Sequence, residues 1–196
     1  MDNMFAIVAD NPAAFAIGTI GMICLAIWPL FQSRSVILIV YIGNNLAFVV
    51  HYALLGHWTA SAMNALMAIQ TVVAIRIVEA PRLRWIYYLL MLVLAALASA
   101  TWVGLPSLFA AMAASFSTLG RMQRHDIALR SLLLCAMPCW LAHDTLIGSM
   151  PGFTADILGI TTGAVMLVQR IFWPNVDLAF WKRRAAPQNF RMTAEF

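Results

Sequence analysis

The chain has 196 residues, of which 63% are hydrophobic and only 10% are charged. A soluble domain carries about 25% charged residues, so this composition excludes a soluble globular protein, and it excludes disordered and nucleic-acid-binding proteins as well. Because a helix that crosses a bilayer uses about 20 residues, the length allows about seven or eight crossings. We therefore predict an all-α integral membrane protein.

Seven apolar segments follow one another along the chain, separated by short polar connections or by turns that contain Gly, Pro or His. They cover residues 12–32, 36–56, 58–78, 85–103, 105–120, 127–148 and 153–173. We expect residues 1–173 to form a single transmembrane domain of seven helices. Residues 174–196 are expected to form a cytoplasmic tail with basic and aromatic side chains.

The distribution of the 12 lysine and arginine residues predicts the orientation of these segments. With seven crossings, all 12 lie on one face, and the other face carries only acidic residues, among them Asp2 and Asp10. Basic residues near helix ends are retained in the cytoplasm, which predicts an outer N-terminus and a cytoplasmic C-terminus. We expect the basic residues to bind anionic lipids of the cytoplasmic leaflet, and Arg76, Arg130 and Arg170 to snorkel to that interface.

An internal repeat connects the second segment with the sixth. His51–Gly56 and His143–Gly148 share the pattern His-x-x-Leu-apolar-Gly at an offset of 92 residues, and the same offset pairs Asn64 with Asp156. The repeat predicts a 3+1+3 arrangement, in which residues 12–78 and 105–173 are parallel three-helix repeats. Residues 85–103 then form a linker helix that faces lipid.

The offset changes by two residues if Arg76 is paired with Arg170, which predicts a short insertion near Met150. Internal repeats of this kind are typical of transporters, whose binding site lies at the interface of the repeats. Small residues at helical spacing, such as Gly18 with Gly21, are interpreted as seams of close helix packing.

Two stretches of the chain resemble the YgjV-type family of bacterial inner-membrane proteins. The first runs from Asn45 to Arg76 with His51, Leu54-Leu55-Gly56, Thr59-Ala60 and Asn64, and the second includes Leu129-Arg130, Trp140, Gly148-Ser149 and Arg170. The resemblance covers most of residues 15–173 and implies a multi-pass protein of the bacterial inner (plasma) membrane. That family is thought to be distantly similar to the SWEET and PQ-loop transporters, which share the 3+1+3 plan and move sugars, amino acids or vitamins.

Polar side chains inside the predicted spans are candidates for a substrate pathway, because such groups are costly in a bilayer and usually have a purpose. Together with Trp140, the candidates are Asn44, Asn45, His51, Asn64, Gln70, His143, Asp144 and Asp156. For the amides the alternative is interhelical hydrogen bonding. Asp144 and Asp156 lie near the outer interface, where a hydrated carboxylate costs little, so they take part only if they point inward.

His51 and His143 allow three interpretations. As residues related by the repeat they could ligate a haem on a pseudo-two-fold axis, they could act as proton-responsive gates, or they could simply bond to backbone carbonyls. Apart from that haem, no cofactor is expected. Cys135 and Cys139 make an incomplete metal site and are interpreted as packing residues, so no metal is expected either.

The sequence lacks the common catalytic motifs, so an enzyme is not expected. Two functions remain: a small-solute transporter with its site between the repeats, or an accessory or assembly subunit whose polar groups contact a membrane-protein partner or a second copy. A water-accessible cavity lined by Asn44, Asn64 and Asp156 would favour the transporter. Polar groups turned toward the outside of the bundle would favour the accessory subunit.

Overall fold

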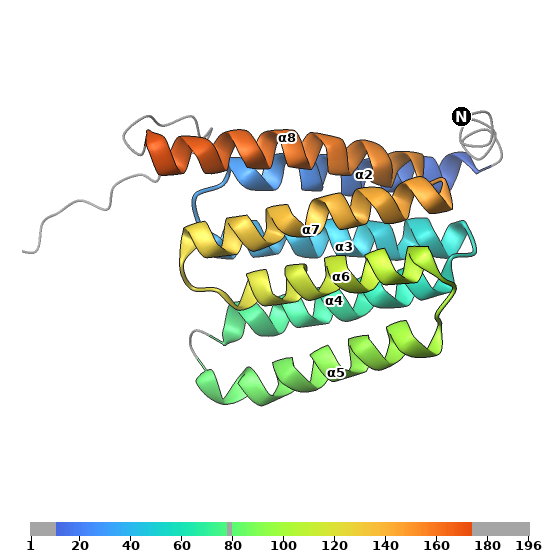
Figure 1. Cartoon of the computed structure of the whole chain (residues 1–196), viewed down its shortest axis with the longest axis horizontal. Helices are drawn as coiled ribbons and strands as arrows, with labels where there is room; N and C mark the ends of the chain where they lie inside the picture. The colour runs from blue at the N-terminus through green and yellow to red at the C-terminus, as the bar shows by residue number, and fades with distance from the viewer. Residues whose placement is uncertain (1–10, 78–79, 174–196) are drawn as a thin grey trace, which may run out of the picture.

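The structure is a computed structural model that describes residues 11–77 and 80–173, and within these residues it is entirely helical (Figure 1). Seven long helices and two short 3-10 turns follow in the order α2 (Pro12–Ile27), η1 (Trp28–Leu30), α3 (Arg34–Leu54), α4 (Trp58–Arg76), η2 (Pro81–Leu83), α5 (Arg84–Ala100), α6 (Leu105–Met122), α7 (Asp126–Ile147) and α8 (Met150–Phe172). The predictions for Asp2, Asp10 and the tail, residues 174–196, lie outside the described residues.

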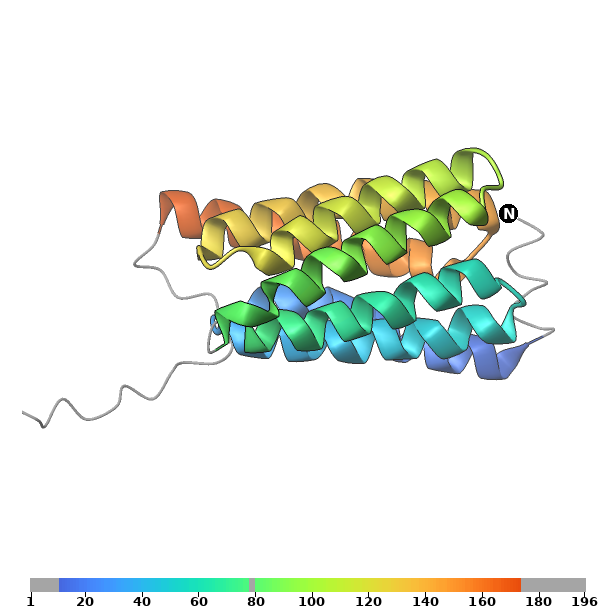
Figure 2. The same ribbon diagram turned by 90° about the horizontal axis from the view of Figure 1, so that it is seen from below.

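Six of the helices form two layers, which Figure 2 shows from the side. In one layer α2 packs on α3 and α3 on α4, and in the other α6 packs on α7 and α7 on α8. The outer helices join the layers, because α2 contacts α8 and α4 contacts α6. The remaining helix, α5, lies at one edge and packs on α4 and α6. The middle helices α3 and α7 therefore face each other across the interior.

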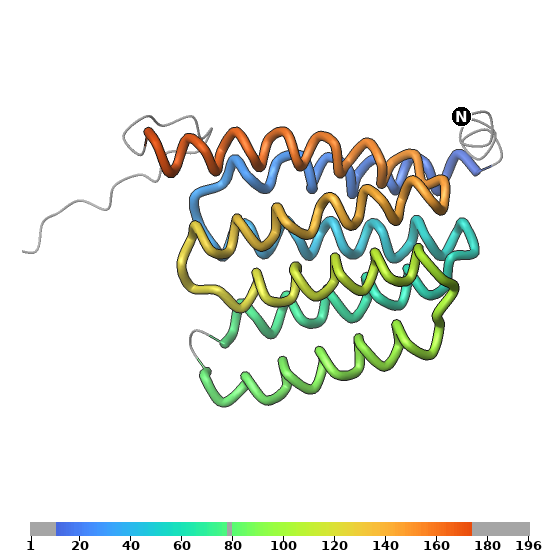
Figure 3. The backbone as a smooth tube through the Cα atoms, viewed as in Figure 1, coloured from blue at the N-terminus to red at the C-terminus, as the bar shows by residue number. Residues whose placement is uncertain are grey.

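Each helix runs antiparallel to the one before it, so the bundle has two ends (Figure 3). We call them the Arg34 end, where α3 begins, and the Gly56 end, where the turn between α3 and α4 lies. Every arginine within the described ranges is at or within about two turns of the Arg34 end: Arg34, Arg76, Arg82, Arg84, Arg121, Arg124, Arg130 and Arg170. The helices thus gather the basic residues at one end, which is the distribution that the sequence predicts.

The helix boundaries differ from the expected segments by a few residues, and local chemistry explains two of the differences. The first segment stops being α-helical at Ile27 and continues as η1, because Pro29 has no backbone N–H to continue the α-helical hydrogen bonds. α8 begins at Met150 instead of residue 153, because Ser149 caps it: the Ser149 hydroxyl accepts from the Gly152 N–H at 3.3 Å. Pro151 in the first turn suits this start.

Five of the helical stretches are long and apolar enough to cross a membrane: Pro12–Leu30, Arg34–Leu54, Trp58–Arg76, Pro81–Ala100 and Met150–Phe172. The least buried of them is the stretch that contains α5, where 17% of the most apolar window is covered by the protein. α6 and α7 do not meet the same hydropathy criteria. Both carry polar or charged side chains that turn toward the interior, such as Ser117 and Arg121 on α6 and Asp144 on α7.

The core between the layers combines large aromatic residues with glycine contacts. Trp28, Tyr41 and Phe48 from the first layer are buried in one apolar cluster with residues of α7 and α8. Gly18 lies where three helices meet, and a Cβ atom there would be 2.7 Å from His51 Nδ1 and 2.8 Å from Pro151 Cβ. The predicted seam of small residues is confirmed at this position, because only the missing side chain lets α2 approach α3 and α8.

We therefore expect Gly18→Ala to lower the thermal unfolding temperature of the purified protein. The added methyl group overlaps the rigid Pro151 ring, and overpacking of a core costs about 1–3 kcal/mol. Gly43→Ala is the matched control, since its Cβ would meet only Cys24 Sγ at 3.4 Å. That variant should be as stable as the parent or more stable, because alanine is favoured over glycine inside helices. Equal destabilisation by the two variants would contradict the seam.

Candidate functional site

A polar cavity of about 40 Å³ lies between the two layers. It is lined from all six helices of the layers and contains amide, carboxyl, hydroxyl and guanidinium groups. One water molecule needs about 10–15 Å³, so the cavity has space for about three. A polar site of this size in the centre of an apolar protein is where a small hydrophilic ligand can replace water.

The cavity brings together six of the nine residues that the sequence singles out. These are Asn44, Asn45, Asn64, Trp140, Asp144 and Asp156, whereas His51, Gln70 and His143 do not line it. Four polar lining residues are absent from the sequence-based candidates: Tyr41, Tyr52, Ser117 and Arg121. The tyrosines and the serine give no signal in a single apolar sequence, and Arg121 lies in a polar connector that resembles an ordinary helix end.

Asp144 and Asp156 point inward and are 3% and 2% exposed, so they are not hydrated carboxylates at the outer interface. The Tyr52 hydroxyl donates to Asp144 Oδ1 at 2.7 Å, which bonds α3 to α7 across the layers. Asp144 and Asp156 line the same cavity, and Asp156 Oδ2 is buried without a partner among the described residues. Two adjacent carboxylates repel unless a proton or another cation lies between them.

Gly152 in α8 leaves the space that the Asp144 carboxyl group occupies. A Cβ atom at residue 152 would lie 2.0 Å from Asp144 Oδ2, so only glycine leaves room for the carboxyl group. The same residue belongs to the first turn of α8, one turn before Asp156. The end of α7 therefore packs directly on the backbone of α8, which brings the two acids together.

The Asn and Gln side chains differ in how many of their hydrogen-bonding groups have a partner in the protein. Asn44 Nδ2 donates to the Gly21 carbonyl at 3.1 Å, and Asn64 Nδ2 donates to the Ala60 carbonyl at 2.9 Å. Asn45 Nδ2 is buried without a partner. Gln70 lies outside the cavity, where its Oε1 accepts from the Thr118 hydroxyl at 3.1 Å and links α4 to α6. Interhelical hydrogen bonding thus accounts for the Asn44 donor and for Gln70 Oε1. Gln70 Nε2 and Asn45 Nδ2 are both buried without a partner, and of these two residues only Asn45 lines the cavity.

Both histidines bond to the backbone near the Gly56 end. His51 Nδ1 lies 2.8 Å from the Ala14 carbonyl and its Nε2 lies 3.1 Å from Ser149 Oγ. His143 Nδ1 lies 2.9 Å from the Pro106 carbonyl. Ligation of a haem by His51 would therefore require one of two protein contacts to break. Among the described residues, no group of three or more His, Cys, Asp or Glu side chains is arranged to hold a metal ion.

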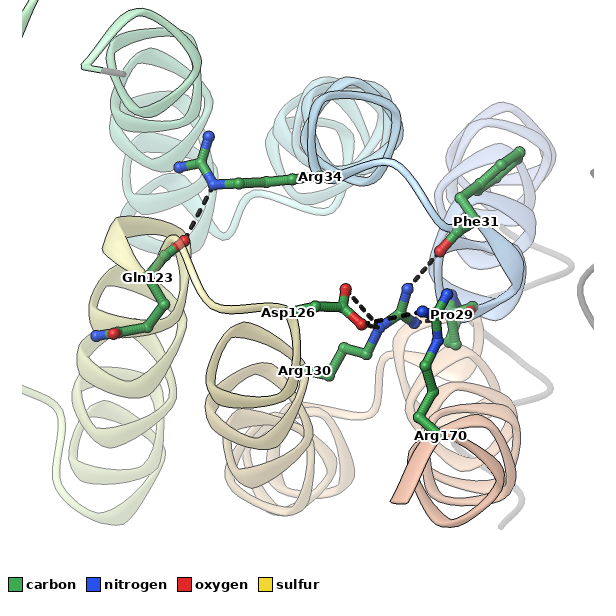
Figure 4. Close-up of polar contacts among 7 residues, drawn as sticks. All are labelled: Pro29, Phe31, Arg34, Gln123, Asp126, Arg130 and Arg170. Atoms are coloured by element: carbon green, nitrogen blue, oxygen red, sulfur yellow. Dashed lines mark hydrogen bonds and ion pairs between the residues drawn. The ribbon is translucent and has the colours of Figure 1, made fainter. Parts of the chain in front are cut away.

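Two arginines are buried in the bundle, and their surroundings differ. Arg130 is 2% exposed, so it does not snorkel to the interface as predicted. Figure 4 shows its guanidinium group bonded to the Asp126 carboxylate and to the carbonyls of Pro29 and Phe31, with an Nη1–O distance of 2.7 Å to Pro29. Arg170 ion-pairs with Asp126 at 3.4 Å. Arg130 is held inside because it binds carbonyls that the η1 turn leaves free.

Arg121 is 1% exposed and lines the cavity, although the sequence places it among the basic residues that flank the interface. Its Nη1 lies 3.4 Å from the Met67 carbonyl, its Nη2 lies 3.5 Å from Met67 Sδ, and the guanidinium carbon lies 5.9 Å from the Tyr41 ring centre. Arg121 Nε has no partner. None of the ion pairs found within the described ranges involves Arg121. Within the part of the chain that the structure describes, this guanidinium group therefore has only weak contacts with uncharged groups.

The two arginines should respond differently to replacement by methionine, which keeps the length and removes the charge. Arg130→Met should lower the unfolding temperature by roughly 6–12 °C, because breaking a buried charge pair costs about 3 kcal/mol or more. Arg121→Met should leave the unfolding temperature of the ligand-free protein unchanged or raise it, because a poorly compensated buried charge is removed. A fluorescence-detected melt in lipid nanodiscs measures both. A comparable loss in Arg121→Met would show that Arg121 has a structural role.

Comparison with known proteins gives one match. The model of the Imp-YgjV family, described as bacterial inner membrane protein, matches residues 13–171, which cover the seven long helices apart from the first residue of α2 and the last residue of α8. No curated protein and no solved structure matches the chain, so the similarity to SWEET and PQ-loop transporters stays a prediction. The match and the apolar helices together assign the chain to the Imp-YgjV family of multi-pass proteins of the bacterial inner membrane.

Proposed function

We propose that the protein is a small-solute transporter whose binding site is the cavity between the two layers. The observation that carries this proposal is the cavity itself, because it is lined by Asn44, Asn64 and Asp156 together with Arg121 and Asp144. Polar groups of this kind are expensive in a membrane and are rare unless they serve a pathway. An accessory subunit would instead present such groups to a partner on the outside of the bundle.

A second cavity supports a route from the Gly56 end. It measures about 270 Å³ and is lined by residues of that end, including His57, Pro106 and His143. Trp140 lines both this cavity and the central one. The ring centres of Trp140 and His143 are 5.6 Å apart in an edge-to-face arrangement. A solute entering from the Gly56 end therefore passes Trp140, whose indole ring packs edge-to-face against the His143 ring.

A two-fold repeat accounts for this arrangement of the site. The bonded pair Tyr52 and Asp144 is 92 positions apart, which is the offset of the sequence repeat. Residues related by a two-fold axis contact each other only next to that axis. His51 and His143 each contact the carbonyl of a residue 37 positions earlier. These matches support parallel repeats of α2–α4 and α6–α8, joined by α5, that rock against each other around the cavity.

The insertion expected near Met150 is not needed. α3 and α7 begin at Arg34 and Asp126, and α4 and α8 begin at Trp58 and Met150. Both pairs keep the offset of 92 that separates Tyr52 from Asp144. Arg76 and Arg170 therefore have different positions in their helices.

In the proposed topology all seven helices cross the membrane, with the Arg34 end in the cytoplasm. α6 and α7 cross as well, because their polar side chains face the cavity and not the lipid. Reporter fusions after Gly56 or Gly104 should then read as periplasmic, and fusions after Arg84 or Arg124 as cytoplasmic. A cytoplasmic reporter at Gly104 would overturn the count of seven crossings.

Alternating exposure of the cavity is the property that separates a transporter from an accessory subunit. In a chain with Cys24, Cys135 and Cys139 replaced by alanine, Ser117→Cys should react with a charged, membrane-impermeant thiol reagent from either side of the membrane. Thr71→Cys is the matched control, since Thr71 is equally buried but bonds to the Met67 carbonyl and does not line the cavity. It should stay unlabelled. Labelling of Ser117→Cys from neither side would favour the accessory subunit.

A further inference from the structure

We propose that the central cavity binds a small zwitterion of the amino-acid type, with the ligand carboxylate at Arg121 and the ligand ammonium group at the Asp144–Asp156 pair. This inference rests on the proposed transport function and specifies the substrate class. It is drawn from the charges that face the cavity and from the partners that those charges lack.

The anionic part of the ligand is indicated by the contrast between Arg121 and the other arginines near it. Arg130 has a carboxylate and two carbonyls as partners, and Arg34 donates to the carbonyls of Ala74, Arg121 and Gln123 at 2.7–3.1 Å. The guanidinium group of Arg121 has contacts of 3.4–3.5 Å to Met67 and a donor, Nε, with none. A planar guanidinium group with free donors is suited to a carboxylate, which it binds through two parallel hydrogen bonds.

The cationic part of the ligand is indicated by the acid pair. Asp144 and Asp156 line the same cavity from α7 and α8, and within the described ranges no lysine or arginine forms an ion pair with either of them. Tyr52 supplies one neutral donor to Asp144, and Asp156 Oδ2 has none. An ammonium group has three donors and a positive charge, so it can bond to both carboxyl groups and relieve their repulsion.

The two charged groups are held apart along the axis of the bundle. Arg121 lies in the last turn of α6 at the Arg34 end, and Asp144 lies in the last turn of the antiparallel helix α7 at the Gly56 end. Both nevertheless line the same cavity. Opposite charges that face one cavity without pairing are complementary to a ligand that carries both charges, with its negative group at Arg121 and its positive group at the acid pair. Asn45 lines the same cavity, and its unpartnered Nδ2 offers one more donor.

The volume restricts the size of the ligand. A cavity of about 40 Å³ accepts few non-hydrogen atoms beyond those of the waters it displaces. Glycine and alanine are the smallest molecules that carry both charges, and the flexible Arg121 side chain can withdraw to enlarge the site. We therefore expect the smallest amino acids to bind best.

Binding to the purified full-length protein in nanodiscs tests this inference, with glycine and L-alanine compared with acetate, methylammonium and acetamide. Glycine or L-alanine should give a saturable rise in unfolding temperature, and the three single-group probes should bind at least tenfold more weakly. Arg121→Met and Asp156→Asn should each abolish the rise. Asp126→Asn is the matched control, because this carboxylate bonds Arg130 and Arg170 outside the cavity. It should leave the rise unchanged.

Three results would overturn the inference. Acetate that binds as well as glycine would remove the role of the acid pair, and methylammonium that binds as well would remove the role of Arg121. If neither glycine nor L-alanine binds but Ser117→Cys is labelled from both sides, the proposed substrate class is refuted and the proposed transport function is still supported. If Ser117→Cys is labelled from neither side, the proposed function itself fails, whatever binds.

Discussion

A bilayer offers no hydrogen-bond partners, and this constraint organises the whole molecule. Polar side chains in the spans must bond within the protein or face an internal cavity. Arg34 and Arg130 show the first solution, since each turns its guanidinium group toward backbone carbonyls that a helix end leaves free. Arg121 and Asp156 show the second, since they keep unbonded atoms beside the cavity. Among the described residues, six buried side-chain atoms have no hydrogen-bond partner, and three of them, on Asn45, Arg121 and Asp156, belong to residues that line the cavity.

The layers are joined differently at their edges and at their centre. At the edges the contacts are close, as where a Cβ atom at Gly159 would lie 3.4 Å from the Leu25 carbonyl. At the centre α3 and α7 are joined through long side chains, and the bond from Tyr52 to Asp144 crosses the gap. The large side chains keep the middle helices apart, and the space between them is the cavity.

Sequence reasoning predicts the helices well because apolar length and turn residues are local signals. It also predicts most of the acids and amides at the cavity, since polar residues are conspicuous in apolar spans. It fails for Arg121, because a basic residue beside Gly120 near a helix end is the usual pattern of an interface anchor. The direction of that side chain depends on α4, which is distant in sequence and contributes Met67. Sequence reasoning fails for Arg130 for the same reason, because Pro29 and Phe31 lie in η1 and directly after it, about 100 positions earlier in the chain.

The turn between α7 and α8 has a consequence for the evolution of the chain. Only Gly148 and Ser149 separate the two helices, and Gly148 has a left-handed backbone with φ of 75°. The position of Asp156 beside Asp144 is therefore set by the number of residues that follow this reversal. One residue inserted or deleted between Ser149 and Asp156 would rotate the carboxyl group by about 100° around α8, out of the cavity. Turns between helices usually tolerate insertions, but the segment from Ser149 to Asp156 should not, because its length sets the direction of the Asp156 carboxyl group.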